Sequence, residues 1–250
     1  MIDSPTPVGA ISSRQSVAVR LGLWAGIVGP VFFVLVFMLD GLFTPGYDAM
    51  KDVVSFLELG PTGWIQSLNF ILTGLLLIVF ALGFSSWMRP RSAPTWRVVT
   101  TVLIALSGVG LIMAGPFLPD PPGTTQFSLH GVLHTIAFTA VFVPLGLACL
   151  SVGGKFIRTA GWRIHGGYSL LAGLFPIFAG LGSLFSSFVT SNASSAAVSA
   201  TSSQFAVGGL INRILIIAAF AWYVILASRL LRRARGGESG VKQPIVARGE

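Results

Sequence analysis

Charged residues are scarce in this sequence. Asp, Glu, Lys and Arg make up 10% of the 250 residues, and only eight of them are acidic, whereas about 25% of a typical soluble domain is charged. Hydrophobic residues make up 53% of the chain, which is more apolar surface than a water-soluble fold of this length buries. We therefore expect its solvent to be largely lipid. The single cysteine, Cys149, excludes a disulfide within the chain and a metal site built from several cysteines.

Long apolar blocks take the place of the missing charges. A block of about 20 apolar residues is enough to cross the hydrocarbon core of a bilayer as an α-helix. Six blocks are present, at 21–43, 64–87, 98–118, 127–152, 168–189 and 205–231. The first is too long for the apolar region of a signal peptide and no small-residue cleavage site follows it, so we expect it to be retained. The predicted fold class is all-α, a polytopic membrane protein with a six-transmembrane-helix bundle.

The basic residues predict the orientation of this bundle, because Lys and Arg near the ends of spans accumulate on the cytoplasmic side. They cluster before the first span, between the second and third, between the fourth and fifth, and at the end of the sixth, whereas Lys51 is the only cation in the three opposite loops. Both ends of the chain are therefore predicted to be cytoplasmic (N-in/C-in). The net charge of +8 follows from this topology, and no folded basic domain remains to bind nucleic acid.

Composition divides the chain into three regions. Residues 1–20 are expected to form a disordered cytoplasmic N-terminus, 21–231 the transmembrane domain, and 232–250 a basic, disordered cytoplasmic tail, because both ends are short and polar. The cytoplasmic loops are brief connectors that imply no soluble partner. Membrane lipids are the expected partners.

The loop after the first span has an amphipathic pattern. From Asp48 to Leu59 it places Val54 and Leu57 on one helical face and Ser55 and Glu58 on the other, and Gly60-Pro61 then ends it. The pattern predicts a short interfacial helix that either acts as a lid over the bundle or merely closes a helical hairpin.

Polar and ionisable residues within the spans gather near one end of the bundle, and such residues tend to face the bundle interior. They are Asp40, Gln66, Asn69, His130, His134, Asn212 and Arg213, with Asp120 just outside the third span. A guanidinium two turns into a span is costly unless it is paired. We expect Arg213 to pair with Asp40 or Asp120, and favour Asp120 because neighbouring prolines hold its backbone rigid. The pair would either serve function or only fix helix register.

The histidine pair has a spacing that metal sites use. His130 and His134 lie four residues apart, so both imidazoles lie on one helical face and could bind one ion. With Asp120 as a third ligand, an open position on a zinc ion would activate water. The alternative is that both histidines only form hydrogen bonds with neighbouring helices.

Several short motifs together resemble a known family. They are Gly29-Pro30, the turn Thr44-Pro45-Gly46-Tyr47-Asp48, Ser55 with Leu57 and Gly60, Asn69, Gly115 with Phe117, Asp120-Pro121, His130-Gly131, His134, and Gly209 with Arg213. In this order they resemble the bacterial membrane-protein family catalogued as domain of unknown function 998, over about 21–231. The resemblance implies a six-span protein of a bacterial cytoplasmic membrane, and brings no established reaction, substrate or cofactor.

The residues favour a binding function for the pocket that these polar groups would line. The expected lining is Asp40, Asn69, Asp120, His130, His134 and Arg213. Arg213 would be available for an anionic head group or carboxylate, so the ligand would be a lipid or small amphiphile. A metal-dependent intramembrane hydrolase that uses Asp120, His130 and His134 is one alternative, and a small transporter or a scaffold is another.

The predicted topology can be tested by labelling engineered cysteines in intact cells. We expect a cysteine beside Asp120 to react with a membrane-impermeant maleimide, and a cysteine beside Arg91 to react only after the cells are permeabilised. Labelling of both from the same side would contradict the six crossings and every site inferred from them.

Overall fold

The computed structural model describes residues 13–122, 124, 127–192 and 207–239, and in this part of the chain the secondary structure is helical. The elements are α1 (Ser13–Phe43), the 3-10 helix η1 (Val54–Leu59), α2 (Gly63–Met88), α3 (Pro94–Ala114), α4 (Leu129–Phe156), α5 (Arg163–Asn192) and α7 (Gly208–Ser239). Within these residues, six helices are long and apolar enough to cross a membrane. The chain is therefore a multi-pass membrane protein, and the predicted fold class is confirmed.

The helix ends differ from the predicted span ends for physical reasons. The third span was expected to reach residue 118, but α3 ends at Ala114 with Gly115 as its C-cap, and Pro116 follows directly and does not continue the helix. Two helices run beyond the expected domain limits, because α1 already begins at Ser13 and α7 continues to Ser239. The remainder of the two predicted disordered ends, 1–12 and 240–250, lies outside the described residues.

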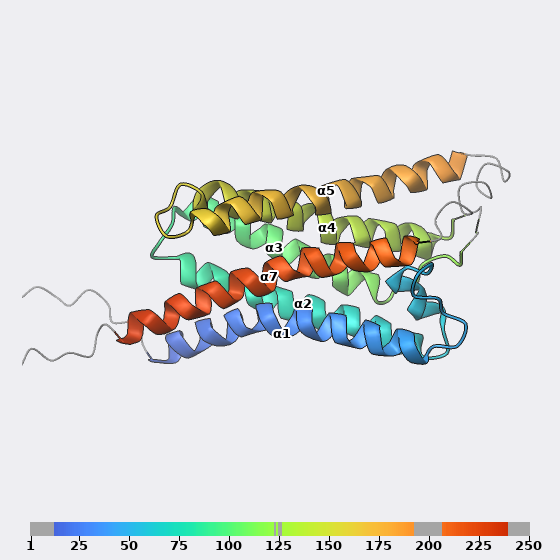
Figure 1. Cartoon of the computed structure of the whole chain (residues 1–250), viewed down its shortest axis with the longest axis horizontal. Coiled ribbons are helices and arrows are strands. Elements are labelled where there is room, and N and C mark those ends of the chain that lie inside the picture. Colours follow the sequence, from blue (N-terminus) through green and yellow to red (C-terminus); the bar gives the residue numbers. More distant parts are fainter. Residues whose placement is uncertain (1–12, 123, 125–126, 193–206, 240–250) are drawn as a thin grey trace, which may run out of the picture.

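The six long helices form an elongated bundle in which neighbours in sequence are neighbours in space (Figure 1). Successive helices from α1 to α5 pack against one another, and α7 closes the bundle mainly against α1 and only lightly against α5. Aromatic side chains fill the centre, and Phe33, Phe80, Trp222 and Tyr223 are completely buried. The result is a well-packed core on the α1, α2 and α7 side, while α5 exposes most of its apolar surface.

Glycines set the closest helix crossings. A Cβ atom added to Gly83 would lie 2.7 Å from the Gly22 backbone, and one added to Gly108 would lie 2.6 Å from the Gly74 carbonyl oxygen. These distances are too short for any side chain. Small residues therefore bring α2 into backbone contact with α1 and α3, as is common where lipid supplies no hydrophobic drive between helices.

The connection between α1 and α2, residues 44–62, folds over the end of the bundle beside the start of α7 (Figure 1). We call it the cap loop. The predicted amphipathic helix over 48–59 is replaced by a turn and the 3-10 helix η1. Val54 and Leu57 are buried as expected, but Glu58, predicted on the solvent side, is only 5% exposed. The tighter winding of a 3-10 helix gives three residues per turn, so Glu58 does not lie where an α-helical pattern would place it.

Candidate functional site

Arg213 binds the cap loop to α7. Its Nη1 donates to the carbonyl oxygens of Ala49 at 2.7 Å and Asp52 at 2.8 Å, and to that of Gly209, one turn earlier in α7, at 3.0 Å. Its Nη2 donates to the Tyr47 hydroxyl. The side chain is 7% exposed. All of these acceptors are uncharged, so the guanidinium is satisfied by backbone carbonyls and a phenol.

Tyr47 completes this clamp. Its hydroxyl lies 3.2 Å from the Asp52 carbonyl oxygen and 3.1 Å from that of Val53. Burial raises the pKa of the Tyr47 phenol, which keeps the proton that it donates to these carbonyls. The phenol therefore accepts from Arg213 and donates back into its own loop.

Further backbone contacts hold the first turn of α7 on the cap loop. The Leu210 amide donates to the Met50 carbonyl oxygen at 3.1 Å, and the Asn212 Oδ1 accepts from the Val54 amide at 3.0 Å. Gly209 permits this approach, because an added Cβ would lie 2.5 Å from the Asp52 carbonyl oxygen. The position of Val54 and Ser55 is thus set by α7.

The expected pairing of Arg213 with Asp120 is wrong. Asp120 accepts from the Ser128 amide at 3.1 Å and lies against Gly131, where an added Cβ would overlap its carboxylate. It therefore stands at the N-terminus of α4, where unpaired N–H groups and the helix dipole favour a negative charge. Asp40 does not pair with Arg213 either: its Oδ1 accepts from the Thr62 hydroxyl at 3.0 Å.

Three buried polar side chains lie on α2: Gln66, Asn69 and Thr73. Asn69 donates to the Phe33 carbonyl oxygen at 3.1 Å and to the Gln66 Oε1 at 3.2 Å. The Asn69 Oδ1, the Gln66 Nε2 and the Thr73 hydroxyl are buried without a hydrogen-bond partner among the described residues. Buried polar groups of this kind are usually satisfied by ordered water.

The two histidines do not meet at a metal site. His130 is exposed and packs edge-on against the Phe117 ring, with centroids 5.9 Å apart. His134 is 8% exposed and its Nδ1 lies 2.6 Å from the Phe117 carbonyl oxygen. In the described part of the chain no three His, Cys, Asp or Glu side chains are close enough to hold a metal ion. The predicted ligand set of Asp120, His130 and His134 is therefore not assembled: both histidines contact Phe117, and Asp120 accepts from the Ser128 amide.

Glu58 is an ionisable residue of this region that the sequence prediction placed on the wrong face. Its Oε1 accepts from the Ser67 hydroxyl at 2.9 Å, and its Oε2 lies 3.7 Å from the His134 Nδ1, too far for a hydrogen bond. Burial raises its pKa from 4.5 to about 8. The carboxyl group is therefore protonated, and neutral, around pH 7.

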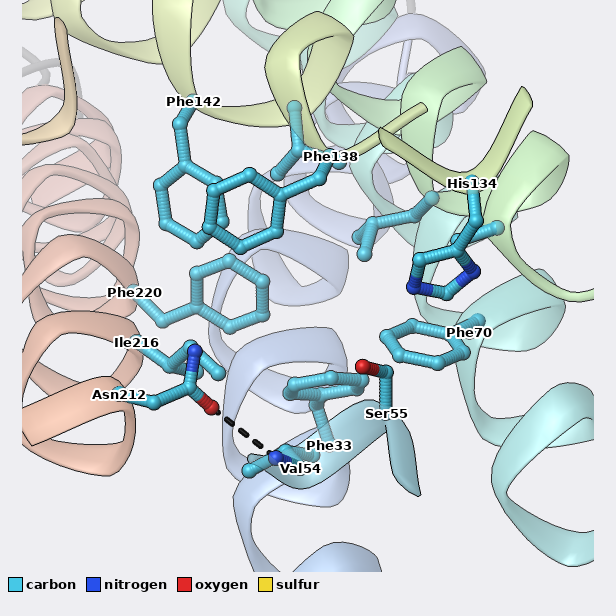
Figure 2. Close-up of a pocket in the computed structure, with 13 residues that line it drawn as sticks. Phe33, Val54, Ser55, Phe70, His134, Phe138, Phe142, Asn212, Ile216 and Phe220 are labelled. Carbon is cyan, nitrogen blue, oxygen red and sulfur yellow. Dashed lines mark hydrogen bonds between the residues drawn. The ribbon is translucent and has the colours of Figure 1, made fainter. Parts of the chain in front are cut away.

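A small cavity lies under the cap loop at the centre of the bundle. Its volume is about 40 Å³, room for a water molecule or a small polar group. Figure 2 shows it walled by the rings of Phe33, Phe70, Phe138, Phe142 and Phe220, with Ser55, His134 and Asn212 at its edge. Apolar rings thus surround three polar side chains that come from the cap loop, α4 and α7.

A larger groove continues from this cavity toward the lipid. It has a volume of about 400 Å³ and runs between α4, α5 and α7, where Ala179, Ser183 and Ile211 contribute to its walls. The cavity and the groove share Ser55, His134, Phe138 and Asn212. The groove reaches the side of the bundle because α5 packs along α4 and contacts α7 only lightly. Its volume is within the range of small-molecule sites.

Only part of the predicted lining is present in this site. His134 lines both the cavity and the groove, whereas Asp40, Asn69, Asp120, His130 and Arg213 are absent from the described lining of either. Ser55 was not predicted as part of the lining, although it belongs to a motif of the family resemblance, because that resemblance assigns it no role. Asn212 was not predicted as part of the lining either, but its place among the polar residues within the spans indicated that it faces the bundle interior.

Comparison with known proteins identifies the family and no activity. The family described as "Protein of unknown function (DUF998)" matches residues 27–229. No curated protein and no solved structure matches the chain.

Replacing Arg213 with Met tests the clamp. The change leaves the carbonyls of Ala49 and Asp52 without their donor, so we expect a loss of stability on the order of 3 kcal/mol and faster proteolysis within the cap loop. Thermal unfolding and limited proteolysis of purified protein measure both effects. Arg158→Met, at an exposed position, is the control, and equal behaviour of the two variants would contradict the clamp.

Replacing Glu58 with Gln tests the buried carboxyl group. Because the folded protein holds this proton more tightly than the unfolded chain does, stability should fall as pH rises from 4.5 to about 8. Glu58→Gln is neutral at every pH and keeps an acceptor for Ser67, so it should reduce this fall in the melting temperature.

Asp48→Asn in the same loop is the matched control, since a hydrogen bond from the Met50 amide lowers the pKa of the exposed Asp48 carboxyl. Its melting temperature should fall with rising pH as much as that of the wild type does. An unchanged pH dependence in Glu58→Gln would show that Glu58 is not the group that titrates.

Proposed function

As a member of the DUF998 family this chain inherits no assigned activity, and we propose that it binds a lipid or another small amphiphile in the groove between α4, α5 and α7. The observation that carries the proposal is the continuity of this groove with the aromatic cavity under the cap loop. A ligand would enter from the bilayer beside α5 and extend its polar end toward Ser55, His134 and Asn212.

The groove has the composition of an amphiphile site. Its lining combines apolar side chains, among them Ala179, Ile211 and Leu215, with a few hydroxyl, imidazole and amide groups. Ligand sites typically combine a mainly apolar lining with a few polar groups that fix orientation. By the predicted topology the inner end lies in the outer leaflet, at the depth of lipid head groups.

The alternative functions have less support. A metal-dependent hydrolase needs ligands that converge, and the described His, Asp and Glu side chains do not. A transporter is expected to place its binding groups near the middle of the membrane, whereas these polar groups lie at one end of the bundle. A scaffold role has no specific observation in its favour.

Filling the groove tests the proposal. Ser183→Trp places a large ring in the groove wall, so we expect at least a tenfold loss of lipid retained by the purified protein, as counted by native mass spectrometry.

The matched control is Gly182→Trp, one residue earlier in α5. Gly182 is exposed, and an added Cβ would meet no atom within 4 Å. We therefore expect the introduced ring to face away from the groove and the amount of retained lipid to be unchanged. Equal retention in Ser183→Trp and the wild type would reject the proposed function.

A further inference from the structure

We infer that the inner end of the groove is a seat for an uncharged, hydroxyl-bearing head group, held by Ser55, His134 and Asn212, and that the ligand is a single-chain neutral amphiphile. The inference rests on the proposed function and specifies the ligand of the same site.

His134 supplies a hydrogen-bond acceptor. Its Nδ1 lies 2.6 Å from the Phe117 carbonyl oxygen, which only accepts, so in the neutral ring Nδ1 carries the hydrogen and Nε2 is an acceptor. Nε2 has no partner among the described residues, and Figure 2 shows the ring at the edge of the cavity with its second nitrogen toward the open space. The residue as a whole is 8% exposed, and this nitrogen is available to accept a hydrogen bond from a ligand or from water.

Asn212 supplies a donor at the opposite side of the cavity. Its Oδ1 is occupied by the Val54 amide at 3.0 Å, and Figure 2 shows its amide nitrogen turned away from that bond. Ser55, the residue after Val54, adds a hydroxyl that both donates and accepts, and no hydrogen-bond partner in the described chain occupies it. One acceptor, one donor and one hydroxyl match the two-way hydrogen bonding of a ligand hydroxyl.

The charges of the site favour a neutral ligand. The described linings of the cavity and the groove include no Lys, Arg, Asp or Glu. Arg213 follows Asn212 directly in the sequence, but its Nη1 and Nη2 donate to the cap loop and to its own helix. A phosphate or carboxylate buried here would have no cation to offset its lost hydration.

The volumes of the cavity and the groove indicate where the head group and the acyl chain of the ligand would lie. The cavity of about 40 Å³ has no room for an acyl chain, so only the head group reaches its edge. The groove of about 400 Å³ takes the chain. A monoacylglycerol and a long-chain alcohol share this chemistry, and they differ in the number of hydroxyl groups.

Equilibrium binding to the full chain in detergent tests the inference, with radiolabelled 1-oleoylglycerol as the probe. We expect saturable binding that oleyl alcohol displaces. Methyl oleate, which lacks a hydroxyl, and 1-oleoylglycerol 3-phosphate, which is anionic, should displace it at least tenfold less well. Displacement by oleyl alcohol assigns the seat to a single hydroxyl, and failure of that displacement assigns it to a glyceryl head.

Ser55→Ala is the decisive variant, because the Ser55 hydroxyl makes no hydrogen bond within the described chain and its loss should not disturb folding. Loss of one hydrogen bond to the ligand predicts about three- to tenfold weaker binding. Ser86→Ala removes an exposed hydroxyl near the other end of α2, outside the linings of the cavity and the groove, and should leave binding unchanged. A melting temperature equal to that of the wild type confirms that Ser55→Ala is folded.

The outcomes separate this inference from the proposed function. If the phosphate probe binds as well as the neutral one, or Ser55→Ala binds as the wild type does, while Ser183→Trp abolishes binding, the head-group seat is overturned and the groove stands. If no probe binds saturably and Ser183→Trp retains as much lipid as the wild type, both are overturned.

Discussion

The guanidinium of Arg213, near the start of a membrane-spanning helix, must find hydrogen-bond acceptors. This requirement shapes this end of the molecule. Arg213 lies near the start of α7 and is 7% exposed, where an unpaired charge is costly. The chain meets this cost by bringing loop carbonyls to it, those of Ala49 and Asp52. The carbonyl oxygens gain a charged donor and the loop gains a fixed position. Asn212, the residue before Arg213, also accepts a hydrogen bond from the Val54 amide, so the same turn of α7 that satisfies Arg213 also places Ser55 at the cavity.

This use of Arg213 decides which chemistry remains for a ligand. If a carboxylate at the groove were the partner of Arg213, an anionic ligand could displace that carboxylate and bind the guanidinium. With carbonyls and Tyr47 as partners, the positive charge is directed into the cap loop. The polar groups left without partners in the described chain at the cavity are neutral: the His134 Nε2, the Ser55 hydroxyl and the Asn212 amide nitrogen. Glu58 does not alter this, since burial raises its pKa to about 8 and it is neutral at pH 7.

The sequence predicted the fold much better than the site. Six long apolar blocks determine six helices because hydrocarbon leaves a backbone segment few other ways to satisfy its polar groups. The partner of Arg213 could not be predicted in the same way. Side-chain reasoning looks for a carboxylate, and the true acceptors are main-chain oxygens that every residue has. Asp120 was assigned to the wrong partner because a helix N-terminus also attracts an acid, and the pairing argument considered only cations. Glu58 was placed outside because an α-helical period was applied to a segment that winds as a 3-10 helix.

Selectivity in such a site must come mainly from its polar end. A soluble protein gains about 0.8 kcal/mol for each CH₂ that it removes from water, but an acyl chain that moves from the bilayer into a groove beside α5 leaves one apolar environment for another. The tail therefore gains little beyond packing, and every lipid of the leaflet offers a similar tail at high concentration. Discrimination is left to the hydrogen bonds formed when a head group leaves the interface and meets His134 and Asn212 among aromatic rings, where an unmatched polar group is expensive. In the proposed site, a few unpaired atoms over a small cavity would thus determine which lipid is retained.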